Sequence, residues 1–317
     1  MEIKKWADKI KGNVNSVIYD KEKVTEKLLV SILCRGHALI EDVPGVGKTV
    51  IAKALAQSLG GRFQRVQCTP DLLPADILGV SIYNEKTMNF DFQDGPIMTN
   101  VLLVDEINRA TPRTQSALLE AMEEGKISVE GTTRELPDPF FLLATENPIE
   151  FEGTFPLPAA QRDRFSLTLS VGYPSKEAEL QIMESHRRVS HPLTDLIEVS
   201  DLNTVIKMQN KSAKIEIDTI TEDFILNMIN LTRKDSRLVS GASPRASIAI
   251  YKGSQSLAGI RGKSIATIPE VIEITPAILH SRLVIKPEYL HKNINSETII
   301  EDILEKAKNI FNEDHKM

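Results

Sequence analysis

Residues 41–50 read EDVPGVGKTV, and this stretch decides the fold of the chain. Gly45 and Gly47 lack a Cβ, so a loop built on them can bring backbone N–H groups close to a ligand. Lys48 then adds a positive charge, and Thr49 adds a hydroxyl that can bind a metal ion. A loop of this composition predicts a site for the phosphate groups of a nucleotide.

The sequence on either side supports a phosphate-binding loop. HALIE at residues 37–41 is typical of a short buried strand, and VIAKALAQSLG at residues 50–60 predicts a helix. The P-loop pattern G-x-x-x-x-G-K-[ST] is matched except at its first glycine, where this chain has Asp42. A Rossmann loop fits less well, because its third glycine would fall on Val50 and Lys48 would have no role. The residues that we expect to bind the nucleotide are Asp42, Val43, Pro44, Gly45, Val46, Gly47, Lys48, Thr49 and Val50.

A second part of a phosphate-transfer site follows at residues 101–106, VLLVDE. Its apolar run predicts a parallel strand buried on both faces, and ligands bind at the carboxyl ends of such strands. We expect Asp105 and Thr49 to hold Mg²⁺, and Glu106 to orient and deprotonate the attacking water. Asn147 ends a later predicted strand, LLATEN, and is a candidate for positioning that water or the γ-phosphate.

The remaining patterns place this site in an α/β domain. Apolar runs and helical periodicity alternate along the first half of the chain, which predicts a parallel sheet flanked by helices. Further strands are expected at residues 63–68, 139–147 and 165–171, and further helices at residues 21–33 and 114–125. Two stretches of alternating apolar and polar residues break this rhythm, and we expect hairpins at residues 79–92 and 126–136.

The predicted secondary structure changes after Tyr173. Strand-like runs mostly disappear, and helical segments follow, beginning at residues 175–188. We therefore place a domain boundary near Gly172, with a nucleotide-binding core over residues 1–172 and a helical domain over residues 173–317. A chain of 317 residues is long enough for two domains.

Three arginines are candidates for contact with a phosphate. Ser243 and Pro244 are typical of a helix start, which puts Arg245 in a first turn, where a cation opposes the helix dipole. An arginine kept there is a candidate for binding a phosphate, and an exposed arginine at mild cost is the alternative. Arg162 and Arg164 precede a predicted strand, and either could be an arginine finger acting on a neighbour's nucleotide. A solvated salt-bridge cluster is the alternative, and the residues alone do not decide between them.

Composition sets limits on the function. Hydrophobic residues make up 41% and charged residues 26% of the chain, as in a globular protein. The net charge of −6 argues against a large nucleic-acid-binding surface. Cys34 and Cys68, the only cysteines, lie in apolar runs and are expected to be buried thiols. The pattern offers no zinc-binding Cys/His spacing, no apolar signal core and no membrane span, so we expect the cytosol.

The motifs, taken in order, resemble those of the AAA+ ATPases and specifically the MoxR family. The stretches that carry the resemblance are EDVPGVGKT, CTPDLLPADILGVSIY, GPIMTNVLLVDEINRATPRTQSALLEAMEE, ATENPIEFEGTFPLPAAQRDRF and SGASPRAS. The resemblance runs from about His37 to about Ile285, and the length of these stretches makes the match specific.

The resemblance implies an αβα core with an all-helical lid, ATP bound between them, and a homo-oligomeric ring of six subunits. The two hairpins would be the inserts typical of this clade. By the same resemblance Asn147 is sensor 1, Arg245 is sensor 2 and Arg164 is the arginine finger. The family usually has an apolar residue where this chain has Arg162, and Arg109, in DEINRA, is a further candidate for a subunit interface.

The implied function is ATP hydrolysis coupled to chaperone-like remodelling of client proteins, in the maturation of protein complexes or the loading of metal cofactors. Partners with von Willebrand A-type domains are implied in the same way. Two other functions stay open: a nucleotide-dependent scaffold with little turnover, against which Glu106 argues, and an AAA+ motor that acts on nucleic acid. The predicted hairpins carry few basic residues for such a motor: Lys86, Lys126 and Arg134.

Overall fold

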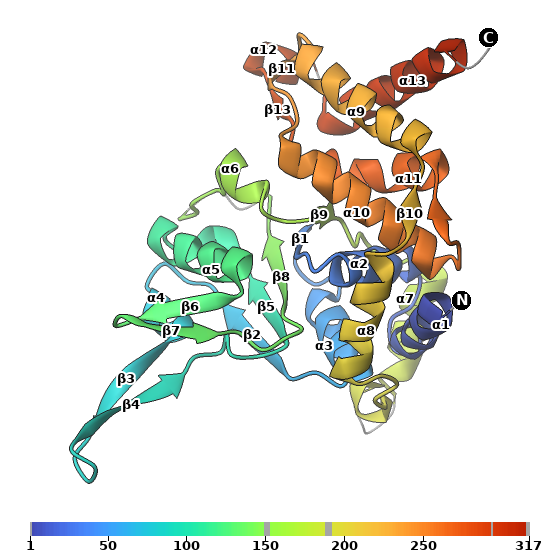
Figure 1. The fold of residues 1–317 in the computed structure, drawn as a ribbon. Coiled ribbons are helices and arrows are strands. Elements are labelled where there is room, and N and C mark those ends of the chain that lie inside the picture. Colours follow the sequence, from blue (N-terminus) through green and yellow to red (C-terminus); the bar gives the residue numbers. More distant parts are fainter. Residues whose placement is uncertain (1, 149–152, 188–191, 293, 315–317) are drawn as a thin grey trace.

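A five-stranded parallel sheet forms the centre of the protein. The structure, a computed structural model, describes residues 2–148, 153–187, 192–292 and 294–314. The strand order is β2–β5–β8–β1–β9, and every neighbouring pair is parallel (Figure 1). The strands are β1 (Ala38–Glu41), β2 (Phe63–Gln67), β5 (Val101–Asp105), β8 (Phe141–Glu146) and β9 (Leu167–Leu169). The predicted α/β sheet is confirmed, and its parallel strands bring their carboxyl ends to one edge.

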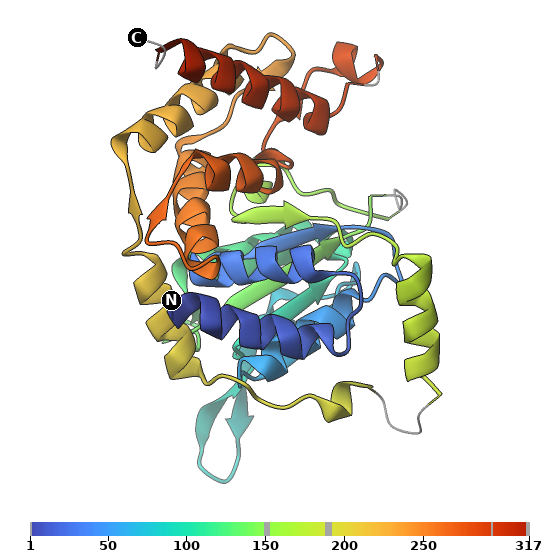
Figure 2. The same cartoon turned by 90° about the vertical axis from the view of Figure 1, so that its right-hand side faces the viewer.

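Helices cover both faces of this sheet. The elements of one face are α1 (Glu2–Asn15), α2 (Glu22–Leu33) and α3 (Lys48–Ser58), and those of the other are α4 (Pro74–Leu78) and α5 (Pro112–Glu124). Figure 2 looks onto the first face, with α1 and α2 in front of the sheet. Ile40 and Leu103 pack with the first group, whereas Leu39 and Leu102 pack with the second. Burial on both faces explains why β1 and β5 are continuous apolar runs. Helix α1 has no counterpart in the sequence-based prediction.

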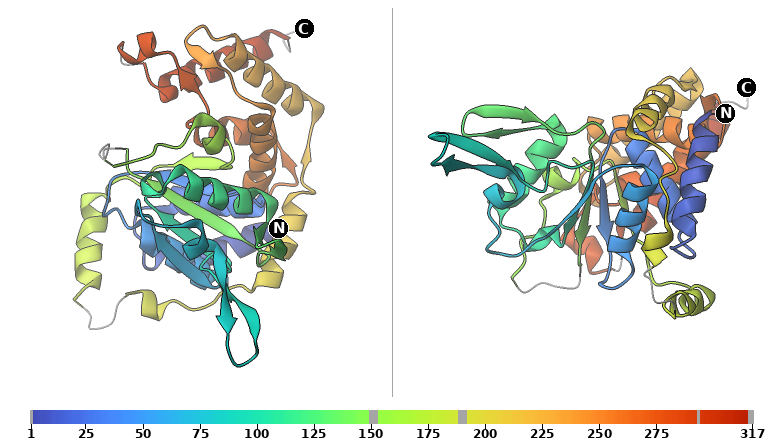
Figure 3. Two further views of the ribbon diagram at one scale, coloured as in Figure 1. Left: turned by 90° about the vertical axis from the view of Figure 1, so that its left-hand side faces the viewer. Right: turned by 90° about the horizontal axis from the view of Figure 1, so that it is seen from below.

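Both predicted hairpins are present. Strand β3 (Gly79–Asn84) pairs with β4 (Asn89–Asp94), and β6 (Lys126–Val129) pairs with β7 (Thr132–Glu135), each antiparallel. The β3–β4 hairpin projects beyond the rest of the molecule (Figures 1 and 3). Large apolar side chains are exposed on it, with Phe90 71% exposed.

A mainly helical region follows the sheet. Its helices are α7 (Lys176–Ser185), α8 (Leu202–Ser212), α9 (Thr219–Lys234), α10 (Pro244–Ile260), α11 (Ile268–Leu279), α12 (Pro287–Leu290) and α13 (Ser296–Asp314). The expected helical region is confirmed, and two short strand pairs also occur in it. They are β10 (Glu216–Ile217) with β12 (Ile265–Ala266), parallel, and β11 (Leu238–Ser240) with β13 (Val284–Ile285), antiparallel. Strands of two or three residues are too short to give an alternating pattern. The helix predicted at residues 175–188 ends at Ser185, and Arg188 lies outside the described residues.

The helical region packs closely on the core. Leu28 of α2, Val205 of α8 and Leu257 of α10 belong to one continuous set of buried apolar residues. The short elements that complete the chain are η1 (Ile107–Arg109), α6 (Ala159–Arg162) and η2 (Pro192–Asp195). A boundary near Gly172 therefore remains a proposal that rests on the change of secondary structure.

The two cysteines are unpaired. Cys68 is buried, as predicted, but Cys34 is only partly buried, which corrects the prediction for that residue. Helix α2 ends at Leu33, and Arg35 has a φ of +54°, so the chain turns toward the surface directly after Cys34.

Candidate nucleotide site

The predicted phosphate loop lies between β1 and α3. Gly47 directly precedes α3 with a φ of +90°, and Gly45 has a φ of +85°, both in the left-handed region that glycine adopts without strain. A Cβ built on either glycine would have no atom within 4 Å, so the space over the loop is open. Helix α3 begins at this loop, and backbone N–H groups at a helix start bind phosphate. The loop therefore fits a nucleotide phosphate.

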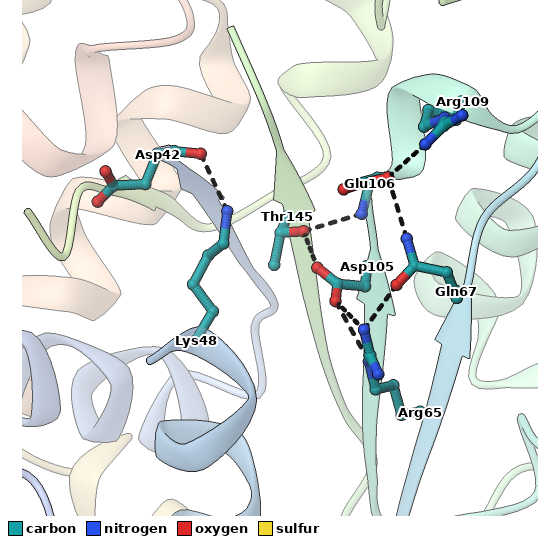
Figure 4. Close-up of polar contacts among 8 residues, drawn as sticks. All are labelled: Asp42, Lys48, Arg65, Gln67, Asp105, Glu106, Arg109 and Thr145. Carbon is teal, nitrogen blue, oxygen red and sulfur yellow. Dashed lines mark hydrogen bonds and ion pairs between the residues drawn. The ribbon is translucent and has the colours of Figure 1, made fainter. Parts of the chain in front are cut away.

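Lys48 supplies the cation of this loop. It is only 7% exposed, and its Nζ donates a hydrogen bond to the backbone carbonyl of Asp42 at 2.9 Å. Burial lowers the pKa of Lys48, and the nearby carboxylates of Asp105 and Asp42 raise it in part. The ammonium group is thus fixed at the carboxyl edge of the sheet, where Figure 4 shows it across Thr145 from the acidic residues.

Asp42, which replaces the first glycine of the P-loop pattern, has a structural task. Its carboxylate accepts hydrogen bonds from the backbone N–H of Val43 at 2.9 Å, and of Val171 and Gly172 at 2.6 Å each. Ser170 Oγ donates to it at 3.0 Å. Burial raises the pKa of Asp42, but these hydrogen bonds outweigh it and the pKa is lowered. The side chain ties the loop to the segment after β9, so contact with a nucleotide is left to the backbone.

Two carboxylates at the end of β5 are held by neighbouring strands (Figure 4). Asp105 Oδ1 accepts a hydrogen bond from Thr145 Oγ1 at 2.6 Å, and Asp105 Oδ2 accepts one from Arg65 at 2.7 Å. Thr145 Oγ1 in turn accepts from the backbone N–H of Glu106 at 2.9 Å. Glu106 has a φ of +57°, a conformation that costs a non-glycine residue about 1–3 kcal/mol and that clusters at functional sites.

Two side chains donate hydrogen bonds to Glu106, and the sequence analysis did not predict these contacts. Its Oε2 accepts hydrogen bonds from Gln67 Nε2 at 3.0 Å and from Arg109 at 3.1 Å. Gln67 lies opposite Asp105 in the register of β2 and β5. The strand carrying Arg65 and Gln67 was predicted, but its place beside β5 was not. Only the strand order brings these two side chains to the acidic pair.

The other predicted residues of the site lie at the same edge. Asn147 directly follows β8, is 3% exposed, and accepts a hydrogen bond through its backbone oxygen from Asn108 Nδ2 at 3.4 Å. Thr49 is the second residue of α3. Mg²⁺ takes oxygen ligands and needs only one or two from a protein when phosphate and water supply the rest. The hydroxyl of Thr49 and the carboxylate of Asp105 fit that requirement.

Arg162 forms ion pairs with two carboxylates of its own chain at this edge. One guanidinium nitrogen lies 3.3 Å from Glu41 Oε1, and the other lies 3.1 Å from Glu146 Oε1. Glu41 is the last residue of β1, which precedes the loop, and Glu146 is the last residue of β8, which precedes Asn147. Arg162 therefore ties two strand ends together beneath the candidate site.

Arg164 and Arg245 lie at the opposite edge. Both pair with Glu123 near the end of α5, Arg164 through its Nε at 3.2 Å. The segment of Arg164 is tied to the amino end of β1, because Ser166 N donates to the His37 carbonyl at 2.8 Å. A strand rises about 3.3 Å per residue, so the two ends of β1 with their flanking residues are on the order of 15 Å apart. Arg245 is therefore held at the edge opposite its own chain's phosphate loop, and its action on a phosphate stays a prediction.

Comparison with known proteins agrees with this geometry. A model of the ATPase family associated with various cellular activities (AAA) matches residues 37–167, and a model of the AAA lid domain matches residues 230–303. Chaperone MoxR1 of Mycobacterium tuberculosis is 40% identical over 301 residues, covering 92% of this chain and 79% of that protein. The chain belongs to the MoxR family of AAA+ ATPases. It is thus an ATPase, as the motifs predicted.

Two further proteins are similar along most of the chain. Uncharacterized protein YeaC of Bacillus subtilis is 43% identical over 296 residues, covering 93% of this chain and 92% of that one. A solved structure from Cytophaga hutchinsonii superposes with a TM-score of 0.91 at 33% identity, covering 96% of this ATPase and 95% of that chain. None of the helices in the described ranges is both long enough and apolar enough to cross a membrane.

Proposed function

We propose that this AAA+ ATPase binds ATP with Mg²⁺ at the carboxyl edge of its sheet and uses hydrolysis to remodel other proteins. The observation that carries the proposal is the convergence of Lys48, Asp105 and Glu106 at this edge, beside an open glycine loop. Phosphoryl transfer needs these three kinds of group: a cation on the phosphates, a metal ligand and a carboxylate that handles the attacking water. A scaffold without turnover would have no use for the third.

Each residue of the edge has a proposed role. Lys48 and the N–H groups of the loop bind the outer phosphates. Thr49 and Asp105 hold Mg²⁺, which when bound neutralises charge on the phosphate oxygens. Glu106 orients the attacking water and accepts its proton, and Asn147 positions that water or the γ-phosphate.

We further propose that Arg164 and Arg245 act on the nucleotide of a neighbouring subunit. A head-to-tail ring, here of six subunits, would place the arginine edge of one copy against the phosphate loop of the next. Arg164 is the arginine finger in this proposal. Arg162 and Arg109 pair with carboxylates at the nucleotide edge of their own chain, whereas Arg164 pairs with Glu123 at the opposite edge.

The β3–β4 hairpin supports a protein rather than a nucleic acid as the client. Met88 is 74% exposed and Phe90 71%, and apolar surface of this kind suits contact with polypeptide. The hairpin carries one basic residue, Lys86, against the acidic residues Glu85, Asp91 and Asp94. We propose a chaperone-like role in complex maturation or metal-cofactor loading, with von Willebrand A-type partners, in the cytosol, where ATP is abundant.

Mixed rings test the trans arrangement. Arg164→Ala removes the finger but leaves the catalytic edge of that subunit intact, and Glu106→Gln does the reverse. Each variant alone should be nearly inactive, since a finger contributes about 10³–10⁵ in rate in related systems. Mixing the two should restore ATPase activity at interfaces that join an intact site to an intact finger. If fluorescence transfer shows that labelled subunits exchange and no activity returns, the trans assignment of Arg164 is wrong.

A further inference from the structure

Arg282, in the helical region, donates four of its five hydrogen bonds to the segment that carries Arg164. We propose that Arg282 is a positioning residue that, through Asp163 and Ser243, fixes Arg164 and Arg245 relative to one another as one unit. The proposal rests on the proposed function, in which those two arginines act on the nucleotide of a neighbouring subunit.

The guanidinium of Arg282 uses all five of its N–H donors. Nε donates to Asp163 Oδ1 at 2.8 Å. One terminal nitrogen donates to the backbone carbonyls of Ser166 at 3.2 Å and Ile278 at 2.5 Å. The other donates to the carbonyls of Asp163 at 3.3 Å and Phe165 at 2.5 Å. A guanidinium has five donors in a fixed planar fork, so its partners fix its position completely.

Four of these five bonds end on residues 163–166, which flank and include Arg164. The Arg282 side chain is 3% exposed. A charge buried to this degree is tolerated only when it is paired and hydrogen-bonded, so this segment cannot move away from Arg282 without a large cost. Lysine could not replace it in kind, because an ammonium group presents three donors from one point.

Asp163 extends the unit to Arg245. While its Oδ1 accepts from Arg282, its Oδ2 accepts a hydrogen bond from Ser243 Oγ at 2.8 Å. Ser243 is the N-cap of α10, and its Oγ also accepts from the backbone N–H of Arg245 at 3.1 Å. The start of α10 therefore lies against the segment before β9 (Figure 1).

Glu123, near the end of α5 in the core, contacts both arginines of the unit. Its two carboxylate oxygens pair separately with Arg164 and with Arg245. The two guanidinium groups are consequently held by the two oxygens of one carboxylate. Because a displacement of about 1 Å at such a site can cost on the order of 10²-fold in rate, the unit has a catalytic consequence.

The test uses Arg282→Lys in the full chain and asks which mixed rings regain activity. The variant should bind a fluorescent ATP analogue with wild-type affinity in its own site, and its kcat should fall at least about 10-fold. Mixed with Glu106→Gln, which supplies an intact finger, it should regain ATPase activity. Mixed with Arg164→Ala it should regain none, since both lack a working finger. If Arg282 served only to stabilise the fold, the variant would not regain activity with Glu106→Gln while failing to regain it with Arg164→Ala.

Ser243→Ala is the second variant, in case Arg282→Lys does not fold. It cuts the link between Asp163 and α10, removes the N-cap of α10 as well, and should give a smaller loss of kcat with the same mixing behaviour. The matched control is Asp218→Ala, which removes the N-cap of α9 without touching the arginine unit. Either variant overturns the proposal if it folds and keeps wild-type kcat, or if it regains activity when mixed with Arg164→Ala. Failure of the Arg164→Ala and Glu106→Gln pair alone would instead overturn the trans assignment.

Discussion

Replacing Arg162 with leucine is expected to destabilise the protein, and adding Glu146→Gln is expected to reverse much of that loss. In the structure Arg162 lies 3.3 Å from Glu41 and 3.1 Å from Glu146, whose side chain is 7% exposed. His280 Nε2 pairs with Glu41 at 3.4 Å from the other side. Without Arg162, two carboxylates at the ends of adjacent strands lose the guanidinium between them, and the His280 contact reaches Glu41 alone.

The magnitude follows from burial. Removing one partner of a fully buried ion pair costs about 3–5 kcal/mol. The Arg162 side chain is 28% exposed, so solvent screens part of the loss and we expect about 2 kcal/mol. Glutamine keeps the shape of Glu146 without its charge. The double variant should therefore recover most of the difference.

The stability difference between these two variants should depend on pH, in a direction that follows from the pKa of Glu146. Burial raises the pKa of Glu146, Arg162 lowers it and Glu41 raises it, with a raised value as the net result. An acid with a raised pKa in the folded state costs stability above its ordinary pKa, and the cost disappears as the pH falls. Loss of Arg162 enlarges this cost. The stability gap between Arg162→Leu and the double variant should thus narrow from about pH 7.5 to about pH 5.

Urea unfolding without nucleotide, followed by circular dichroism, measures these differences. The matched control is Lys211→Leu, which removes an exposed ion pair with Glu2 and should change stability by about 0–1 kcal/mol. The reasoning is refuted if Arg162→Leu unfolds at the wild-type urea concentration, or if Glu146→Gln recovers nothing at neutral pH.

Three further outcomes are expected at the site and the hairpin. Lys48→Ala should abolish ATP binding in calorimetry while the circular dichroism spectrum is retained, and binding equal to wild type would contradict its role on the phosphates. Glu106→Gln should keep ATP binding but lower phosphate release by about 10²-fold or more, because an amide cannot accept the proton; unchanged turnover would place the base elsewhere. Phe90→Ser should leave basal ATPase activity unchanged and reduce client capture by a Glu106→Gln trap, with Ser81→Ala, on the same hairpin, as the matched control; equal capture by all three would exclude the hairpin tip as the client contact.

The parts of the fold that could be predicted are those with a local signal. The β1–loop–α3 unit and strand β5 follow from glycine chemistry and from apolar runs that end in charged residues. The exposed hairpin at residues 79–92 follows from its alternation. The paired strands β10 to β13 gave no such signal, since two or three residues have no readable period.

The site was predicted in its residues but not in its geometry. Arg65 and Gln67 contact the acidic pair only because β2 is the neighbour of β5, and strand order is set by tertiary packing. Arg245 was recognised from its helix start, and Ser243 is indeed the cap. Nothing local, however, says at which edge of the sheet that helix begins. The fold was therefore needed to ask whether Arg245 acts on the nucleotide of its own chain or on that of a neighbour.

Three consecutive residues connect these findings. Arg162 holds the ends of β1 and β8 below the phosphate loop, Asp163 receives Arg282 and Ser243 from the helical region, and Arg164 is the proposed finger. Successive Cα atoms are 3.8 Å apart, so these three contacts start within about 8 Å of one another along the backbone. This short segment thus connects the strand ends, the helical region and the proposed finger. Because Arg162 is the member of this segment that contacts the strand ends, the double variant Arg162→Leu/Glu146→Gln separates the two tasks. It should keep the finger function in mixed rings while removing the charged tie to the strand ends.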